Sequence, residues 1–199
     1  MTTVKSVGMD QHAILADIMR LHAPDGFEVD VTYGNGGLYK GGIPQPVHKF
    51  DIDPQAEGVI CRDSQYTGLP NGETGSVIYD PPFLTYIRKG RDGNGHMALA
   101  KRFGGYWSYD ELQEDYIHSI SEAYRILKKK GVYVIKCQDI IHNHKMHCTH
   151  GMVINMAEVE GFRLLDLFIL HKAHRMRSPQ KGQQRHARIH HSYFLVFKK

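Results

Sequence analysis

Apolar positions with a helical period mark the predicted helices of this chain. In residues 10–22 the apolar side chains share one face, and Asp10 stands before them as an N-cap residue. Residues 109–130 have the same period, end in three lysines and are followed by Gly131, which suits a C-cap. We therefore predict helices over these two segments, and a third, shorter helix over residues 149–160.

Short runs rich in β-branched and aromatic residues predict the strands. They cover residues 27–31, 48–52, 58–61, 76–80, 132–137, 164–170 and 192–197. In the second half of the chain strands and helices alternate. This alternation indicates an α/β protein with a mainly parallel sheet and helices on its faces.

The connections between strands in the first half of the chain are short. Fourteen residues separate Gly36 from Asp51, and five separate Asp53 from Val59. A parallel crossover normally needs about a dozen residues or more. We therefore expect reduced crossover helices here, with one sheet face covered by the N-terminal helix or by a second subunit of a homodimer.

Composition narrows the class of protein further. A chain of 199 residues suits a single domain, and its net charge of +4 is compatible with a polyanionic partner. Three cysteines favour a reducing cytoplasm over a disulfide framework. We expect a cytoplasmic protein without a membrane partner, because no apolar run approaches a membrane span and the N-terminus lacks a signal-peptide pattern.

A glycine-rich loop follows the first predicted strand. Asp30 and Thr32 come directly before Gly34 and Gly36, and glycines in this place let a ligand approach the backbone closely. The spacing differs from the dinucleotide-binding fingerprint, and no clear helix follows, which argues against pyrophosphate binding. The loop is instead a candidate site for another nucleoside-type ligand.

Further acids follow the next predicted strands. Asp51 and Asp53 end the second strand, and Asp63 follows the third. An acid at the end of the second strand can accept hydrogen bonds from both ribose hydroxyls, and one after the third strand can accept from an adenine amine. The sequence leaves open which of Asp51 and Asp53 would contact the ribose.

The run Ser76 to Phe83 is the most specific feature of the chain. Three apolar residues lead into Asp80, and then Pro81 and Pro82 end the strand because proline fixes φ and donates no hydrogen bond. The acceptor oxygens of this turn and the Phe83 ring suit a planar substrate that carries an NH₂ group. A simple strand end with a Pro-Pro turn is the alternative interpretation of the segment alone.

These motifs together resemble the class I S-adenosylmethionine-dependent methyltransferases that modify exocyclic base amines, in particular the small phage and prokaryotic DNA enzymes. Residues 30–36 resemble the first cofactor motif, and Asp80-Pro81-Pro82-Phe83 matches the catalytic motif. Residues 131–139 and 186–198 are similar to later strands of the family. The resemblance implies a Rossmann-like fold with an antiparallel last strand, and S-adenosylmethionine as cofactor.

The resemblance also implies roles for individual residues. Asp80 and the Pro81 carbonyl would accept the two amine hydrogens, and Phe83 would stack on a base flipped out of the duplex. Asp at the first position and an aromatic residue at the fourth favour adenine N6 over cytosine N4. The predicted cofactor-binding residues are Asp30, Thr32, Gly34, Gly36, Asp51, Asp53 and Asp63. We expect one methyltransferase domain over residues 1–199. In a departure from the family, the sequence indicates no separate target-recognition domain.

Two alternatives to DNA methylation remain open at this stage. The first is an RNA base methyltransferase that acts on adenine N6 or guanine N2, since guanine enzymes can also use this motif. The second is a catalytically inactive module that keeps the fold and binds nucleic acid. The intact tetrapeptide argues against the second alternative.

Basic residues gather in two predicted loops, at 84–107 and 172–191. Lys and Arg can neutralise phosphates, and we interpret these loops as DNA contacts. The candidate nucleic-acid-binding residues are Arg88, Lys89, Arg91, Arg175, Arg177, Lys181, Arg185 and Arg188. The alternative is a pair of charged loops that only contact solvent.

The His-rich run from His142 to His150 also contains Cys148 and could suggest zinc. Its spacings fit no closed zinc site. We therefore predict a polar loop and helix cap here, and no metal.

Overall fold

An eight-stranded mixed sheet forms the centre of the computed structural model, which describes residues 3–83, 85, 105–172 and 183–199. The strand order is β1-β9-β10-β6-β5-β2-β3-β4. The strands of this sheet are β1 (Val7–Gly8), β2 (Val29–Asp30), β3 (His48–Asp51), β4 (Ile60–Cys61), β5 (Thr74–Tyr79), β6 (Leu127–Cys137), β9 (Arg163–His171) and β10 (His191–Lys198). A separate hairpin contains β7 (Ile140–His142) and β8 (Lys145–His147).

The strand directions confirm the predicted architecture. Neighbouring strands from β4 to β6 are parallel, whereas β10 runs antiparallel to both β6 and β9. In the centre of the sheet Tyr79 pairs with Ile135, and Val134 pairs with Val196. The sheet is therefore mainly parallel with an antiparallel strand near one edge, as expected for the Rossmann-like α/β class.

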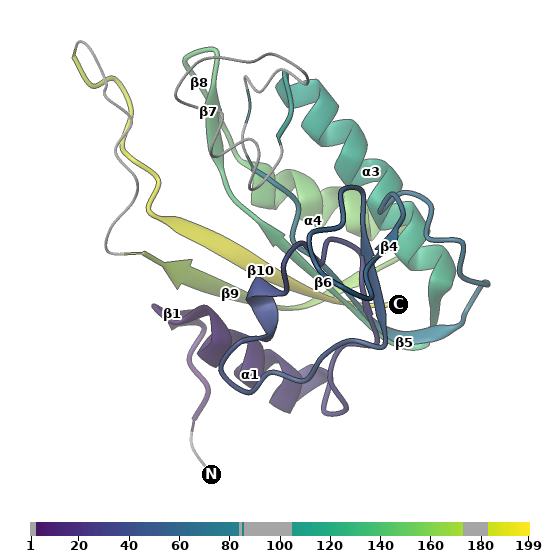
Figure 1. Ribbon diagram of the computed structural model, residues 1–199. Coiled ribbons are helices and arrows are strands. Elements are labelled where there is room, and N and C mark those ends of the chain that lie inside the picture. The colour runs from purple at the N-terminus through teal and green to yellow at the C-terminus, as the bar shows by residue number, and fades with distance from the viewer. Residues whose placement is uncertain (1–2, 84, 86–104, 173–182) are drawn as a thin grey trace.

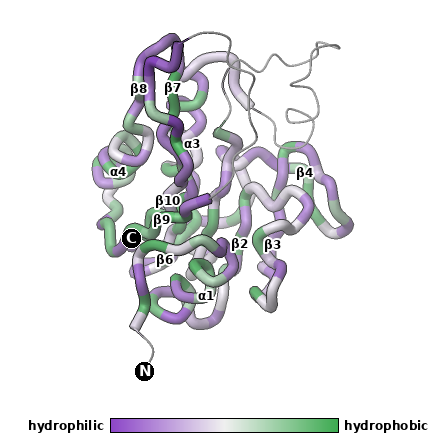
Figure 2. Tube along the Cα trace, turned by 90° about the vertical axis from the view of Figure 1, so that its left-hand side faces the viewer, coloured by the Kyte–Doolittle hydropathy of each residue, from purple (hydrophilic) through white to green (hydrophobic). Residues whose placement is uncertain are grey.

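Helices cover both faces of the sheet. The helices are α1 (Gln11–His22), the short 3₁₀ helix η1 (Gly37–Tyr39), α3 (Tyr109–Ile126) and α4 (Thr149–Glu160). Figures 1 and 2 show α3 and α4 on one side of the central strands and α1 on the other. Two clusters of buried hydrophobic residues lie on the two faces, one with α3 and α4 and the other with α1. The strands contribute to both clusters, because alternate residues of a strand point to opposite sides of the sheet. Each fully buried aliphatic or aromatic side chain contributes about 1.5–3 kcal/mol by leaving water.

The short crossovers expected in the first half of the chain are present. Between β2 and β3 the described helical structure is η1, a single 3₁₀ segment of three residues. Its Leu38 and Tyr39 are buried in the same cluster as Ile14 and Leu15 of α1. The N-terminal helix and η1 thus share one apolar core, which replaces part of the missing helical cover.

The end of α3 differs from the prediction. The helix predicted over 109–130 is present from Tyr109 to Ile126, but its predicted end and the Gly131 cap are wrong, because Leu127 is already extended, with φ −71° and ψ 138°. Pairing of Leu127 with Thr74 begins β6 there, so sheet hydrogen bonding overrides the helical period. The register shifts before Val132, and residues 128–130 are exposed at this irregularity. Gly131 serves close packing instead, since a Cβ there would lie 2.8 Å from Leu127 Cδ2.

The other two predicted helices are confirmed, and so are their ends. Asp10 caps α1 by accepting hydrogen bonds from the backbone N–H groups of His12 and Ala13, at 2.8 and 3.4 Å. Gly161 ends α4 in the left-handed conformation, with φ 115°. Asp and Gly are residue types favoured at these two positions, because they allow backbone groups that a helix end leaves unpaired to be hydrogen-bonded.

Residues 140–147 form a hairpin that the sequence did not predict. Ile140 pairs with His147 and His142 with Lys145, across a turn in which Asn143 and His144 have φ values of 49° and 58°. Positive φ at both central residues suits a tight hairpin turn, and Asn tolerates it well. The expectation of a polar loop over 142–147 is therefore wrong.

In the described part of the chain, no helix combines the length and the hydropathy that a membrane span requires.

Candidate active site

The carboxyl ends of the parallel strands bring most of the predicted site residues to one edge of the sheet. Strands β3, β2, β5 and β6 are neighbours and run in the same direction. The glycine loop follows β2, Asp51 ends β3, and Asp80 follows β5. Ligands of open α/β sheets bind at this edge. The edge is therefore the candidate active site.

Asp30 lies beneath the glycine loop and supports its shape. Its carboxylate is fully buried and accepts hydrogen bonds from the Thr32 N–H at 2.8 Å and the Tyr39 hydroxyl at 2.7 Å. Burial raises the pKa of Asp30 to about 7, although these two hydrogen bonds lower it. Since the side chain does not reach the surface, its contacts are with the loop and with η1.

The loop itself contains two glycines in the left-handed region. Gly34 has φ 56° and Gly36 has φ 73°. A Cβ on Gly36 would lie 2.7 Å from the Tyr33 hydroxyl oxygen, so a side chain there would clash with Tyr33 unless the tyrosine moved. The Tyr33 ring stacks on Tyr39 with centroids 5.4 Å apart, and its hydroxyl donates to Gln45 at 2.6 Å. The loop is thus a narrow backbone cradle that requires glycine.

Asp51, and not Asp53, contacts this cradle. Asp51 Oδ2 accepts a hydrogen bond from the Gly34 N–H at 2.7 Å, and Oδ1 accepts from the Asp53 N–H at 2.9 Å. Asp53 is exposed and lies beyond the strand end. Of the two acids that the sequence left open, Asp51 is the one joined to the glycine loop.

Asp63 lies in the turn after β4 and organises that turn. Its Oδ1 accepts from the Gln65 N–H at 3.0 Å. The following residues are anchored on α3, because Thr67 donates through N–H and hydroxyl to Glu122 Oε1 at 2.8 and 2.6 Å. Helix α3 therefore sets the position of the Asp63 turn relative to the sheet.

The tetrapeptide begins where β5 ends. The Asp80 N–H donates to Thr32 Oγ1 at 2.7 Å, which joins the tetrapeptide to the glycine loop. Pro81 is buried, whereas Pro82 and Phe83 are half-buried. An acid, a carbonyl turn and a partly accessible ring thus lie together at the sheet edge, next to the loop.

Two residues at this site were missed from the sequence. The Lys136 ammonium donates to Asp80 Oδ2 at 2.8 Å and to Gln11 Oε1 at 2.8 Å. Lys136 interrupts the apolar strand 132–137, and a lysine in a buried strand could have signalled a paired charge. Gln11 carries no comparable signal, since it lies at the start of a helix distant in sequence.

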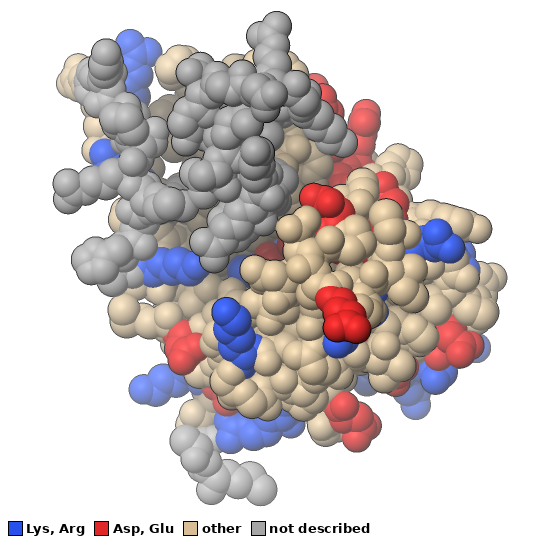
Figure 3. All heavy atoms as spheres, in the orientation of Figure 1, with Lys and Arg blue, Asp and Glu red and all other residues tan. Residues whose placement is uncertain are grey.

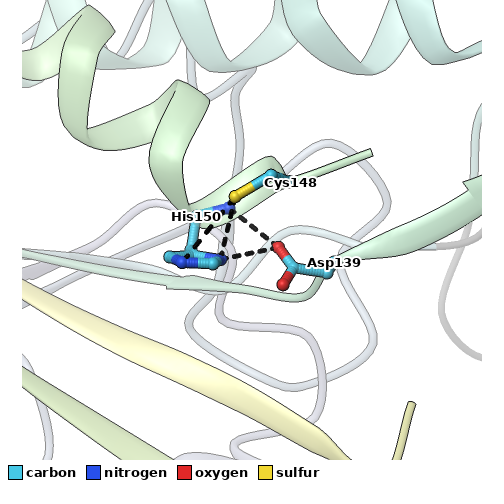
Figure 4. A group of neighbouring side chains, drawn as sticks. All are labelled: Asp139, Cys148 and His150. Carbon is cyan, nitrogen blue, oxygen red and sulfur yellow. Dashed lines mark hydrogen bonds and ion pairs between the residues drawn. The ribbon is translucent and has the colours of Figure 1, made fainter. Parts of the chain in front are cut away.

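A hydrogen-bonded cluster lies beyond the end of β6 (Figure 4). The ligand atoms of Asp139, Cys148 and His150 all lie within 4.8 Å of one another. His150 Nδ1 is 2.7 Å from Asp139 Oδ1, and Asp139 Oδ2 accepts from the Tyr193 hydroxyl at 3.1 Å. Cys148 Sγ is 3.6 and 3.8 Å from the two ring nitrogens of His150, so the sulfur lies over the ring face and not along a nitrogen lone pair.

The cluster of Asp139, Cys148 and His150 lies at the N-terminus of α4. Asp139 Oδ1 also accepts from the His150 N–H at 3.2 Å, while the N-cap residue Cys148 makes no side-chain cap hydrogen bond. Asp139 thereby satisfies one of the first backbone N–H groups of the helix. The expectation that the run from His142 to His150 binds no metal stays a prediction.

Most of the candidate nucleic-acid contacts lie outside the described residues. These are Arg88, Lys89, Arg91, Arg175, Arg177 and Lys181. Arg185 and Arg188 are described and exposed, in the segment that leads into β10. Between them, His186 Nε2 is 2.9 Å from the His144 carbonyl oxygen, which joins this segment to the β7–β8 turn. Elsewhere, Figure 3 shows basic and acidic side chains interspersed over the described part of one face.

A family model for DNA methylases matches residues 76–199. The matched segment is more than half of the 199-residue chain and includes the tetrapeptide. The chain belongs to the DNA methylase family. A comparison with curated protein sequences gave no match.

Solved structures show the same fold. An S-adenosylmethionine-dependent methyltransferase from Archaeoglobus fulgidus is 16% identical, with a TM-score of 0.50 over 96% of this chain and 95% of that chain. The N-methyltransferase NodS from Bradyrhizobium japonicum WM9 is 11% identical, with a TM-score of 0.55 over 93% of each chain. The fold is the Rossmann-like fold of S-adenosylmethionine-dependent methyltransferases.

The chain spans about half the length of another matched structure, the protein TTHA0409 from Thermus thermophilus. In complex with S-adenosyl-L-methionine that protein is 18% identical, with a TM-score of 0.49 over 76% of this chain and 55% of that chain.

Proposed function

We propose that this protein transfers a methyl group from S-adenosylmethionine to an exocyclic amine of a DNA base, with adenine N6 as the favoured target. The observation that carries the proposal is the hydrogen bond between Thr32 and Asp80. It joins a glycine cradle suited to a nucleoside-type cofactor with an acid, proline and aromatic motif suited to a planar amine. Membership of the DNA methylase family supports the same conclusion.

The residues of the cradle fit the proposed cofactor. The left-handed Gly34 and Gly36 leave the backbone open to a ligand, and Asp51 lies against the loop with a carboxylate that can accept from ribose hydroxyls. Asp63, in the turn after β4, is the candidate acceptor for the adenine amine. Bound S-adenosylmethionine would supply an activated methyl group on a sulfonium centre.

The tetrapeptide would prepare the target amine. The lone pair of such an amine is delocalised into the ring, which makes the nitrogen a poor nucleophile. Hydrogen bonds to the Asp80 carboxylate and the Pro81 carbonyl hold both amine hydrogens, favour a tetrahedral nitrogen and free its lone pair. As the N–CH₃ bond forms, the sulfonium S–CH₃ bond would break to leave a neutral thioether, and the nitrogen would then lose one of its two hydrogens to solvent as a proton. Phe83 stacks on the base and fixes its plane. The residues therefore act by positioning and by electrostatic stabilisation.

DNA binding at this site is part of the same proposal. Arg185 and Arg188 are exposed in the segment that leads into β10, and β10 begins at the catalytic edge because it is antiparallel to β6. Cations in this place can pair with phosphates on either side of a flipped base.

Methyl transfer from labelled cofactor tests the proposal. The full chain is incubated with methyl-labelled S-adenosylmethionine and either double-stranded DNA or RNA, and the nucleosides are then separated. We expect labelled N6-methyladenine from DNA. Label in N4-methylcytosine would contradict only the choice of base, and label in RNA alone would contradict the choice of DNA. Cofactor binding without transfer to either polymer would indicate a binding module.

A further inference from the structure

Lys136 lies in β6, among buried apolar residues that alternate between the two faces of the sheet. Val132 and Val134 belong to the buried cluster on the α1 face of the sheet, whereas Tyr133 and Ile135 belong to the cluster on the opposite face. By this alternation Lys136 points to the α1 face, where its side chain is 10% exposed. Burying a lysine ammonium group to this extent costs folding free energy unless the group is paired with an opposite charge and hydrogen-bonded.

The partners of Lys136 come from two other elements. Its Nζ donates to Asp80 Oδ2 at 2.8 Å, and that carboxylate is 20% exposed. The same Nζ donates to Oε1 of Gln11, the first residue of α1, at 2.8 Å. Gln11 therefore fixes the ammonium group from one side while the ammonium group fixes Asp80 from the other.

Lys136 also lies near the ring proposed to stack on the base. Its Nζ is 6.0 Å from the centroid of Phe83 and 5.5 Å from that of Phe194. These distances are within the range of cation–π attraction. One ammonium group is thus paired with the acid at the start of the tetrapeptide and lies at the limit of cation–π range from the ring at its end.

The pairing leaves one carboxylate oxygen of Asp80 for another donor. Oδ2 is taken by Lys136, and among the described residues Oδ1 has no hydrogen-bond partner. The backbone N–H of Asp80 is held by Thr32. Backbone and one oxygen are thereby fixed, which sets the plane of the carboxylate and the direction of Oδ1.

The geometry points to Lys136 as a positioning residue for methyl transfer, with Gln11 as its support. It holds the Asp80 carboxylate so that Oδ1 alone faces the target amine. This inference rests on the proposed function, because it assigns how Asp80 is oriented for that reaction. Without the ammonium group the Asp80 carboxylate could rotate about its side-chain bond, and Oδ1 would no longer be held in the direction of the amine.

A double-variant cycle on the full chain tests the pairing without any need for activity. The melting temperatures of Asp80→Asn, Lys136→Met and the double variant are compared with that of the unchanged protein. We expect the double variant to melt at a higher temperature than the sum of the two single effects implies, because each single change leaves the other charge unpaired. Additive effects would overturn the pairing.

Single-turnover kinetics on DNA test the positioning role. Lys136→Met should slow methyl transfer about 100-fold, as expected for a misplaced acceptor. The dissociation constants for cofactor and DNA should each change less than about threefold, since neither ligand is proposed to contact the ammonium group. Gln11→Leu should slow transfer in the same direction but less, and adding it to Lys136→Met should cause no further loss.

Lys199→Met is the matched control. Lys199 is also a partly buried lysine, and its Nζ donates to the carbonyl oxygens of Tyr124 and Leu127, but it lies at the opposite end of β6. We expect wild-type transfer rates for this variant. An active wild type with an equally active Lys136→Met would overturn the positioning role alone, whereas a wild type inactive on both DNA and RNA would overturn the proposed function.

Discussion

The hydroxyl of Thr32 accepts a hydrogen bond from the backbone N–H of Asp80 at 2.7 Å, across 48 residues of sequence. Thr32 follows β2 and Asp80 follows β5, and these strands are neighbours in the sheet. The contact therefore couples the loop proposed to hold the cofactor with the acid proposed to hold the target amine. A change at Thr32 should act on both.

Replacing Thr32 with Val removes this contact while keeping the shape of the side chain. The half-buried Asp80 N–H then lacks a partner, which costs about 1–3 kcal/mol of stability. We expect methyl transfer to slow about tenfold through loss of alignment. Thr32→Ser keeps the hydroxyl and should remain close to wild type. Urea denaturation and single-turnover rates measure the two effects, and equal behaviour of the two variants would contradict the coupling.

Asp80→Ala should abolish methyl transfer, since it removes the proposed acceptor for the amine. Cofactor affinity should stay within about tenfold, or roughly 1.4 kcal/mol, because the glycine loop is intact. Phe83→Ala should reduce transfer less, as the acid and the Pro81 carbonyl still hold the base. Transfer assays and calorimetric titration of the cofactor measure these effects. An Asp80→Ala enzyme with near-normal turnover would refute the role of Asp80.

Gly36→Ala should weaken cofactor binding about tenfold or more, because Tyr33 cannot easily move away from the new methyl group. The matched control is Gly42→Ala. Gly42 has φ 87°, also left-handed, but a Cβ there would meet no atom within 4 Å. Both variants therefore strain the backbone, but only Gly36→Ala places a methyl group against Tyr33. Calorimetry with S-adenosylmethionine separates them, and equal affinities would indicate that the cradle does not hold the cofactor.

The buried carboxyl of Asp30 should make stability depend on pH. Burial raises the pKa of Asp30 from 3.8 to about 7. Between these values the folded protein binds the proton more tightly than the unfolded chain does, so stability falls as the pH rises through this window. The slope is at most about 1.4 kcal/mol per pH unit, and no further loss is expected above the folded pKa.

Asp30→Asn cannot titrate and isolates this contribution. We expect the free energy of unfolding of the wild type, minus that of Asp30→Asn, to decrease from about pH 4.5 to about pH 7 and then to stay level. Urea denaturation at several pH values provides the measurement. A difference that grows with pH would show that the hydrogen bonds from Thr32 and Tyr39 outweigh burial.

Arg185 and Arg188 should contribute to DNA affinity without reading sequence. If each cation meets one phosphate, removing either should lower the salt slope of binding by about one unit and weaken all sequences alike. Lys129→Ala is the control, because Lys129 is exposed near the start of β6, at the opposite edge of the sheet. Affinity measured against salt for the three variants tests this. Unchanged slopes for both arginines would mean that they only contact solvent.

The groups that stand at the sheet edge could be predicted from the sequence because their placement depends on local patterns. An apolar strand followed by acid, glycines or prolines places those groups at a strand end, and parallel strands bring their carboxyl ends together. Asp51, Asp80 and the loop around Gly34 therefore lie near one another as expected. The helix over 10–22 follows from its apolar period and its Asp10 cap in the same way, and the end of the helix over 149–160 follows from Gly161.

The remaining features depend on contacts between distant segments, which no local pattern records. Pairing of Leu127 with Thr74 ends α3 early, although the helical period continues. Asp51, and not Asp53, contacts the glycine loop, and this depends on which carboxylate reaches the Gly34 N–H. Lys136 meets Asp80 because the two strands are neighbours with their side chains on one face, and Gln11 reaches the Lys136 ammonium only because α1 packs against that face. Sequence alone determined which groups stand at the strand ends; the tertiary structure decided which of them touch, because such contacts depend on register, face and packing across the whole chain.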